Sequence, residues 1–369
     1  MREKVKSMRP FFPDDQINNI INDIRVCLKQ GSLRFGEKCG EFEKEFSNYI
    51  GTKFGVSVNS CTTALTIGLR HFDVKMKNVI VPSNTFISCP NSIKYAGGTP
   101  KFVDINPKTL NMDFENIVNN IDNKTAGVLL VHIGGLPFAD TKALKDVCDD
   151  KGLFLIEDCS HAHGATIHGK KAGSLGHMGC FSFYPTKIMT TGTGGMITTN
   201  DESLKETSKC LRYFGGDKSL KNFENFGNDW FLSDINCIVG LHQLRQLEDN
   251  INNRNKIAKI YNQELSEMKD LQLIETPEGV RNSYYKYSTI LNEKINREEL
   301  TKKILERYNI ELSRFYYPCH KEPIYKNYND IKLKHTEDIL PRVLCLPIFG
   351  DMSEEEAMYV CEVMKKELN

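Results

Sequence analysis

The sequence predicts an α/β protein in which helices cover both faces of a mostly parallel β-sheet. Short apolar runs rich in Val, Ile and Phe alternate with amphipathic segments through the first two-thirds of the chain, and the last third changes character. A length of 369 residues exceeds what one small core needs and predicts two domains. We expect a large α/β domain over residues 1–250 and a small α+β domain over residues 251–369.

Individual elements follow from the spacing of apolar residues. Five short segments have the length and composition of buried strands: residues 54–58, 79–81, 101–103, 126–131 and 154–156. The segments between them carry a helical pattern: residues 62–72, 87–96, 114–120 and 140–150. In the last third we predict one long helix over 231–268, a strand over 284–290, and helices over 297–308 and 353–368. The final helix is expected to turn Met358, Val360 and Val363 toward the core.

The charge balance argues against several classes of partner. The 48 Lys and Arg residues equal the 48 Asp and Glu residues, so no net field points to a nucleic acid or an anionic membrane. The longest apolar runs are far shorter than a membrane span, and the N-terminal residues lack the apolar segment of a signal peptide. Twelve cysteines without any C-x-x-C pair fit buried thiols in a reducing compartment. We therefore expect a cytoplasmic protein.

Ligands of doubly wound sheets bind at the carboxyl ends of the strands, so the loops after the strands are the places to search for a site. After the first predicted strand, Ser60, Cys61 and Thr62 open a helix whose free N–H groups suit a phosphate. Ser60 or Thr62 could equally be an ordinary N-cap. After the fifth strand, Glu157 and Asp158 place carboxylates where substrates or cofactors bind, or where they cap the next turn.

The densest run of small residues surrounds Lys187. A lysine among Ser, Thr and Gly, beside apolar Ile188 and Met189, is expected in a confined site where its amine acts as a nucleophile. A solvated loop lysine is the alternative. The glycines that follow form neither G-x-x-x-x-G-K-[ST] nor G-x-G-x-x-G between a strand and a helix. Their pattern argues against ATPases and nicotinamide dehydrogenases.

Taken in chain order, these segments resemble the motifs of the DegT/DnrJ/EryC1/StrS family of pyridoxal-phosphate-dependent sugar aminotransferases. The matching segments are residues 31–36, 42–43, 61–65, 82–86, 102–105, 131–135, 157–164 and 182–195. The ordered set, with an Asp, a Ser and a Lys at matching positions, is far more specific than any single motif. It implies a fold-type-I transferase, with a large, mostly parallel sheet domain and a smaller C-terminal α+β domain.

The resemblance implies a cofactor, pyridoxal 5′-phosphate, whose ring works as an electron sink while its nitrogen stays protonated. Asp158 would face that nitrogen, and Lys187 would bind the cofactor covalently and later move the proton. Phe86 would stack on the ring, and His161 would lie beside the ring hydroxyl. Asp158, Lys187 and His161 are therefore the expected catalytic residues.

The same resemblance implies further contacts, the substrates and a homodimer. These contacts are Cys61, Thr62 and Ser182 around the phosphate, Asn228 at the partner's phosphate site, and Arg314, Tyr317 and His320 at the substrates. Arg314 either binds the carboxylate of the donor or belongs to a structural ion pair. The donor would be an amino acid, usually glutamate in this family. The acceptor would be a keto-sugar, usually nucleotide-linked, in amino-sugar biosynthesis for a surface polysaccharide or a secondary metabolite.

Two positions depart from the family's pattern. Cys61 stands where the family usually has Gly, which requires a negative φ at this residue. In the segment that reaches the partner subunit, alignment on Ser233 puts Phe231 opposite the family's Arg and Asp229 opposite its Asn. Because a carboxylate beside a phosphate is unfavourable, we assign the contact to Asn228, with a shift of one residue.

Several alternatives stay open from the sequence. A sugar 3-dehydratase of the same family would carry His in place of Lys187, so Lys187 argues against it. A regulatory homologue could bind the cofactor without turnover, and the acceptor could be a keto-cyclitol or a small phosphorylated ketone. A hydrolase using Cys159 and His161 is disfavoured, because residues two apart on a loop rarely face each other. His161 and His163 form an H-x-H without a second ligand pair, so we expect no metal site.

Overall fold

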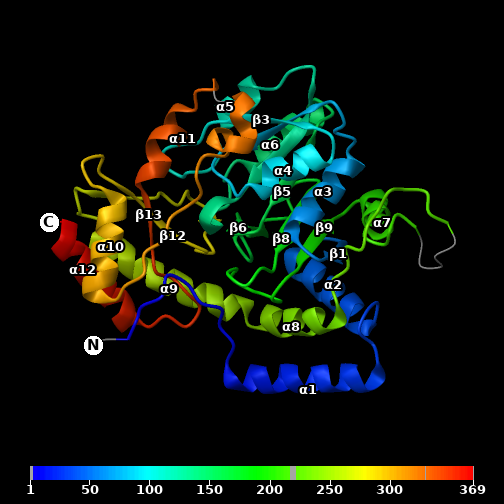
Figure 1. The fold of residues 1–369 in the computed structure, drawn as a ribbon, viewed down its shortest axis with the longest axis horizontal. Helices are drawn as coiled ribbons and strands as arrows, with labels where there is room; N and C mark the ends of the chain where they lie inside the picture. Colours follow the sequence, from blue (N-terminus) through cyan, green and yellow to red (C-terminus); the bar gives the residue numbers. More distant parts are fainter. Residues whose placement is uncertain (1–2, 217–221, 329, 369) are drawn as a thin grey trace.

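The computed structural model describes residues 3–216, 222–328 and 330–368, and its centre is a seven-stranded sheet (Figure 1). The strand order is β1 (Phe54–Val58), β9 (Gly195–Thr199), β8 (Met178–Ser182), β5 (Phe154–Asp158), β4 (Thr125–Val131), β2 (Asn78–Pro82) and β3 (Thr99–Val103). Neighbouring strands from β8 to β3 are parallel, whereas β9 is antiparallel to both β1 and β8. The prediction of a mostly parallel sheet is confirmed, and all five predicted strands belong to it. β8 and β9 escaped prediction because Gly, Cys and Thr interrupt their apolar pattern.

Each face of the sheet has its own helices, as in a doubly wound fold. The helices of this part are α1 (Asp14–Gln30), α2 (Glu37–Ile50), α3 (Cys61–His71), α4 (Ser88–Tyr95), α5 (Phe114–Asn119), α6 (Thr141–Asp150) and α7 (Glu202–Leu211). Leu129 of β4 and Ile156 of β5 pack in one core with α3, α4 and α7. Leu130 and Leu155, on the opposite face, pack in another core with α5 and α6. The four helices predicted between the strands are therefore present.

The single helix predicted over residues 231–268 is wrong. The structure has two helices, α8 (Asp234–Arg245) and α9 (Leu247–Leu265), separated at Gln246. Ser233 caps α8 by accepting from the backbone N–H of Asn236 at 3.2 Å, so the helix begins three residues later than expected. Apolar residues recur with helical spacing on both sides of Gln246, and periodicity therefore could not reveal the break.

The last third is built around an antiparallel sheet of β10 (Leu271–Leu273), β12 (Tyr287–Leu291) and β13 (Val343–Leu346). It shares a core with α9, α10 (Arg297–Tyr308) and α12 (Glu354–Leu368), and Val5 from the N-terminal segment packs in the same core. The region thus has the expected α+β composition. The domain boundary at residue 250 stays a prediction: Ile251 of α9 packs with the core of α2 and α8, and Ile257 packs with the second core.

Two details of the last third differ from expectation. Met358 is 37% exposed, whereas Val360 and Val363 are buried as predicted. Met358 lies beside the buried stripe of α12, which passes through Val360 and Met364. The strand expected from residue 284 begins only with β12, because Tyr284 has a left-handed φ of 48°.

Short elements connect the two parts. They are a small sheet of β11 (Val280–Arg281), β6 (Thr166–Ile167) and β7 (Lys170–Lys171), the helix α11 (Lys334–Ile339), and the 3-10 turns η1 (Ile133–Gly135), η2 (Cys319–Lys321), η3 (Pro323–Tyr328) and η4 (Leu340–Arg342). Among the residues described, no helix combines the length and apolar character that crossing a bilayer requires.

Candidate active site

A cavity of about 470 Å³ opens at the carboxyl ends of the parallel strands. Its walls include residues that end or follow β1, β2, β4, β5 and β8. Among the predicted site residues it is lined by Cys61, Thr62, Phe86, Asp158, His161, Ser182 and Lys187. The sheet therefore brings these side chains together from four separate strand ends, at the edge where such folds bind small molecules.

The N-terminus of α3 forms one wall of this cavity. Ser60 is the N-cap, and its hydroxyl accepts from the backbone N–H of Thr63 at 3.1 Å. Cys61 is helical and has a negative φ, which removes the concern about a missing glycine. The N–H groups of Cys61 and Thr62 lie in the first turn, where no intrahelical acceptor exists, so they remain available to an anion.

Gly195 of β9 packs closely against this first turn of α3. A Cβ atom at Gly195 would lie 2.5 Å from the carbonyl carbon of Ser60 and 2.7 Å from the backbone nitrogen of Cys61. Only glycine allows this close approach of β9 to the start of α3. The glycine pair at residues 194–195 thus allows the N-terminus of α3 to lie at the cavity and does not itself form a nucleotide-binding loop.

Asp158 ends β5 inside the cavity, and its side chain is only 4% exposed. One carboxylate oxygen, Oδ1, accepts from the backbone N–H of Ser160 at 2.9 Å. The other oxygen, Oδ2, accepts from the thiol of Cys89 at 3.0 Å. A buried carboxylate held by these donors faces a site where a cationic ring nitrogen could be stabilised.

His161 is held between two hydrogen bonds. Its Nδ1 accepts from the backbone N–H of Gly134 at 3.2 Å, and its Nε2 lies 3.2 Å from the Tyr316 hydroxyl. Because Nδ1 is an acceptor, Nε2 carries the proton. Burial, reinforced by the positive charges of Lys187 and Lys286, holds the pKa of His161 well below its ordinary value. His161 is therefore a neutral ring, stacked 4.2 Å from Tyr285.

Lys187 projects from the loop between β8 and β9, and its Nζ lies 4.7 Å from the centre of the Tyr285 ring. Helices α8 and α9 fix the loop: Asn236 donates to the carbonyl of Thr191 at 2.6 Å, and Asn250 donates to the carbonyl of Ile188 at 2.9 Å. The half-buried lysine is thus placed by tertiary contacts and is no ordinary solvated loop residue.

Phe86 and Ser182 complete the predicted set. Phe86 is 53% exposed in the loop between β2 and α4, and its ring centre lies 5.2 Å from that of Tyr316. Ser182 is buried at the end of β8, and its hydroxyl accepts from the backbone N–H of Tyr184 at 3.4 Å. The proton of this hydroxyl remains free to donate into the cavity.

Comparison with known proteins identifies the family from the whole chain. Residues 14–365 match the model of the DegT/DnrJ/EryC1/StrS aminotransferase family. The chain belongs to this family. It is accordingly a pyridoxal-phosphate-dependent aminotransferase of the predicted fold.

Two relatives and one solved structure illustrate the similarity. Spore coat polysaccharide biosynthesis protein SpsC of Bacillus subtilis is 32% identical over 94% of this chain and 93% of its own. The dTDP-4-dehydro-2,3,6-trideoxy-D-glucose 4-aminotransferase of Saccharopolyspora spinosa is 34% identical over 90% of each chain. The crystal structure of NtdA from Bacillus subtilis, with bound cofactor PMP, superimposes with a TM-score of 0.90 at 27% identity, covering 100% of this chain and 86% of that chain.

The described residues fit the cofactor of this family. A helix N-terminus backed by glycine, a buried carboxylate, a lysine and an exposed aromatic ring all line one cavity. These are the groups that a phosphate, a ring nitrogen, an aldehyde and an aromatic face require.

Only some of the residues expected to bind the substrates lie close to this cavity. Arg314 and Tyr317 line an outer hollow of about 340 Å³, which shares Thr85, Phe86 and Tyr316 with the cavity. We call it the outer hollow. Arg314 lies 3.5 Å from Glu298, and Tyr317 is 61% exposed.

The structure places His320 away from both openings. The ring is fully buried, with Nδ1 2.6 Å from the Ser83 hydroxyl and Nε2 3.2 Å from Glu337. The 3-10 turn η2 directs the side chain into the core, and this corrects the expectation that it lines the site. Tyr316 lines the cavity instead, beside His161. Tyr317 was expected from the resemblance to the family, and adjacent tyrosines in an irregular segment show no period that separates inside from outside.

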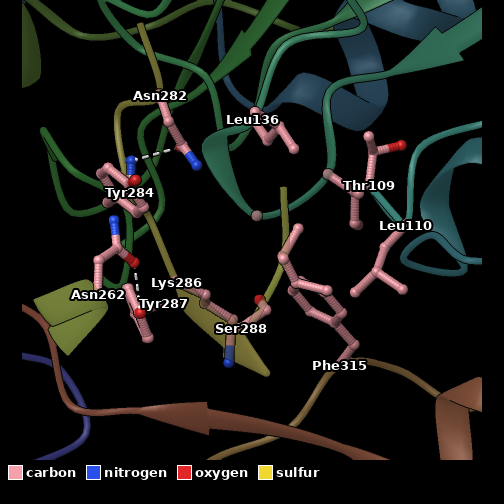
Figure 2. A pocket seen from close by; sticks show the side chains of 13 residues that line it. Thr109, Leu110, Leu136, Asn262, Asn282, Tyr284, Lys286, Tyr287, Ser288 and Phe315 are labelled. Atoms are coloured by element: carbon pink, nitrogen blue, oxygen red, sulfur yellow. Dashed lines mark hydrogen bonds between the residues drawn. The ribbon is translucent and has the colours of Figure 1, made fainter. Parts of the chain in front are cut away.

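Lys286 is a second cation that the sequence analysis missed. It lines the cavity and also a narrow space between η1 and β12, shown in Figure 2 with Leu136 and Phe315. Its Nζ donates to the carbonyl of Arg314 at 3.0 Å and to the Ser313 hydroxyl at 3.2 Å. The narrow space holds about 20 Å³, enough for one water molecule and too small for a sugar. Of the two spaces, only the cavity is therefore large enough for Lys286 to meet a substrate there.

Asn228 and Asp229 are exposed and lie outside the cavity of their own chain. The backbone N–H of Asp229 donates to Oδ1 of Asn228 at 2.8 Å. The Asp229 carboxylate forms an ion pair with Arg34, whose guanidinium lies 4.8 Å from the centre of the Phe231 ring. The carboxylate is thus occupied on the surface, and Asn228 remains the candidate for a contact with the partner.

The hydrolase alternative finds no support in the geometry. Both ring nitrogens of His161 are engaged elsewhere, by Gly134 and Tyr316. Burial and nearby carboxylates raise the pKa of the Cys159 thiol well above its ordinary value, so it stays protonated.

A possible metal cluster, made of His132, Glu157 and Cys159, is closed by hydrogen bonds. The Nδ1 atom of His132 accepts from the backbone N–H of Phe138 at 3.0 Å, and Nε2 lies 3.0 Å from Glu157. The Glu157 carboxylate also accepts from three backbone N–H groups, of which that of Gly176 lies at 2.6 Å. The ring nitrogens of His132 and the carboxylate oxygens of Glu157 are thus already engaged within the protein.

Proposed function

We propose that this aminotransferase moves an amino group from L-glutamate to a keto-sugar linked to a nucleotide, in amino-sugar biosynthesis. The observation that carries the proposal is the convergence of Asp158, Lys187 and the N-terminus of α3 on one cavity. The two relatives above support a sugar acceptor: one acts on a dTDP-linked keto-sugar, and one serves polysaccharide biosynthesis, as their names state. The product would enter a surface polysaccharide or a secondary metabolite.

The chain's own side chains supply the steps around the cofactor. When bound, pyridoxal phosphate supplies an electron sink that stabilises negative charge on the neighbouring carbon. Lys187 would hold the cofactor between reactions and would then carry the proton on its Nζ. Asp158 would keep the ring nitrogen protonated, and neutral His161 would lie beside the ring hydroxyl. Phe86 would cover the ring face.

The cavity and the outer hollow carry groups that suit the phosphate of the cofactor and the carboxylate of the donor. The phosphate of the cofactor would be held by the N–H groups of Cys61 and Thr62 and by the Ser182 hydroxyl. Arg314 in the outer hollow would receive the carboxylate of glutamate, for which a guanidinium offers two parallel hydrogen bonds. Tyr316 lies between the hollow and the cavity, and so between the donor and Lys187.

A homodimer is part of the proposal. Helix α1 lies at the edge of the molecule against α8 (Figure 1), and its outer side exposes Ile17, Ile21 and Leu28 at 39%, 47% and 56%. These residues recur with helical spacing and form an apolar stripe that a second copy could cover. The exposed Asn228 would then reach the phosphate site of the partner.

The cysteines support a cytoplasmic enzyme. All twelve are free thiols, and eleven of them are buried. Cys39 and Cys237 lie with their sulfur atoms 3.2 Å apart and unbonded. Such a pair fits a compartment that keeps thiols reduced.

The visible absorption spectrum of the purified protein tests the central claim. The wild type is expected to be yellow with pyridoxal phosphate and to lose this band when glutamate is added. Lys187→Ala should lack the band, and Lys170→Ala, on an exposed lysine outside the cavity, should keep it. A wild type that stays colourless would overturn the proposal.

The acceptor and the non-catalytic alternative are tested by turnover. Release of 2-oxoglutarate from glutamate with a dTDP-, UDP- or GDP-linked keto-sugar supports the proposal. Turnover only with a keto-cyclitol or a small phosphorylated ketone would replace the acceptor. A glutamate-insensitive yellow protein without turnover would indicate a regulatory homologue.

The cross-subunit role of Asn228 predicts complementation. Mixed dimers of Lys187→Ala and Asn228→Ala chains hold one site with an intact lysine and an intact partner asparagine. Activity should therefore recover to about a quarter of the wild-type value after statistical mixing, since half of the dimers are mixed and each holds one complete site. An Asn228→Ala homodimer with wild-type activity, or mixed dimers that recover no activity, would contradict the role.

A further inference from the structure

The carboxylate of Asp158 is surrounded by thiols instead of the usual hydroxyl or amide donors. The thiol of Cys89, on α4, lies 3.0 Å from Oδ2, and the sulfur of Cys61, on α3, lies 3.9 Å from Oδ1. Cys89 is 1% exposed and Cys61 is 7% exposed. The conventional donor to this carboxylate is the backbone N–H of Ser160, on Oδ1.

Each thiol is oriented by a hydroxyl on its far side. The Thr85 hydroxyl lies 3.0 Å from the sulfur of Cys89, and the Ser160 hydroxyl donates to the sulfur of Cys61 at 3.0 Å. A sulfur that accepts from a hydroxyl can direct its own S–H toward the carboxylate. The contact at Cys89 is short enough to restrain Oδ2, whereas the contact at Cys61 is long.

The thiols keep their protons in this environment. Burial, and secondly the charge of Asp158, raise the pKa of both Cys61 and Cys89 well above the ordinary value. Burial also raises the pKa of Tyr316, Cys159 and Cys180, and the charge of Asp158 contributes along with other neighbouring groups. Cys89 is therefore a permanent donor to Asp158.

A thiol differs from a hydroxyl in what it does to a carboxylate. An S–H group is a weak donor, so it fixes the position of an oxygen while neutralising little of its charge. A hydroxyl at the same place would form a stronger bond and stabilise the negative charge more. The nature of the donor at residue 89 thus sets how strongly Asp158 can attract a proton on the opposite side.

We propose that Cys89 is a positioning residue that holds Asp158 toward the cofactor's ring nitrogen while leaving the carboxylate's charge available to that nitrogen. This inference rests on the proposed function, because it needs the cofactor in the cavity. Cys89 lies behind the carboxylate and acts only through Asp158. Its sulfur also lies 3.0 Å from the hydroxyl of Thr85, the residue that precedes Phe86 in the chain.

The test uses holoenzyme loaded with pyridoxal phosphate labelled with ¹⁵N in the ring. Cys89→Ser should shift the ring-nitrogen resonance toward the value of the unprotonated ring, with little change in cofactor affinity. Cys89→Ala should leave the resonance at the wild-type position, or move it further toward the protonated value. It should also weaken cofactor binding about threefold to tenfold, because the carboxylate loses its restraint.

Cys148→Ser is the matched control, since it places a hydroxyl at another fully buried cysteine, in the core of α5 and α6. It should lower the melting temperature without moving the resonance. Cys89 variants that change only the melting temperature, like the control, would overturn the inference. A wild type without any bound ¹⁵N signal would overturn the proposed function, which separates the two failures.

Discussion

The inner wall of the cavity and the outer hollow differ in how deeply their side chains are buried and in how fully these are hydrogen-bonded. On the inner wall, Asp158 and His161 are each 4% exposed, and each has hydrogen bonds on both sides. In the outer hollow, the Arg314 side chain is 63% exposed and Tyr317 is 61% exposed. The comparison teaches that hydrogen bonds within one chain hold the side chains of the inner wall in place, whereas the side chains of the outer hollow are open to solvent.

Asp158→Asn should remove most of the activity. An amide cannot keep the ring nitrogen protonated as a carboxylate does, so we expect kcat to fall about 10²- to 10⁴-fold. Steady-state kinetics with glutamate measure this, and Asp146→Asn on an exposed face of α6 serves as the control. Activity within tenfold of the wild type would contradict the assignment of the inner wall.

Arg314→Ala should act on binding instead of chemistry. Loss of a charged hydrogen bond to the donor carboxylate should raise the KM for glutamate about tenfold or more, with kcat little changed. Glu298→Gln removes the carboxylate 3.5 Å from Arg314, so it should leave this KM unchanged or lower it. If both variants lower only the melting temperature, Arg314 belongs to a structural ion pair, and the outer hollow does not bind the donor.

His163 offers the smallest test, on stability. Neither ring nitrogen has a well-oriented hydrogen bond among the described residues. Burial and the charge of Lys187, opposed by a poorly aligned contact with the backbone of Ser182, lower the pKa of His163 to about 3. The unfolded chain binds this proton below about pH 6.5, so the folded state loses stability as the pH falls toward 3. Between pH 7 and pH 5, the free energy of unfolding of His163→Leu should fall by about 2 kcal/mol less than that of the wild type.

Urea unfolding of the two proteins at both pH values measures this difference. Equal losses would show that His163 finds a partner or a proton in the folded state. The core around His163, which packs against Phe181 and Phe183, would then be less dry than its burial indicates.

Much of the inner wall could be predicted from the sequence. Strand-sized apolar runs between helical segments indicate a parallel sheet, and the carboxyl ends of such strands meet at one edge. Asp158 directly follows one of these predicted strands, so local pattern and fold class together place it. Ser182 and Lys187 end or follow β8, which the apolar pattern did not reveal, and the resemblance to the family indicated them. The negative φ of Cys61 also agrees with the condition set from the sequence.

The outer hollow and the helix break could not be predicted in this way. Residues 313–320 have no regular period, so nothing in the sequence distinguishes Tyr316, which faces the cavity, from Tyr317 and His320, which do not. The break at Gln246 lies between two segments with the same apolar spacing. In both places the outcome depends on neighbours that are distant in the sequence.

By itself, the sequence determined the alternation of strands and helices, and with it the loops that carry the chemistry. Periods of two and of 3.6 residues are local, and they decide which side of an element is buried. Only the tertiary structure decided that Cys89 contacts Asp158, that Tyr316 contacts His161, and that Gly195 backs α3. These contacts join residues from different elements, and their geometry exists only once the cores have packed.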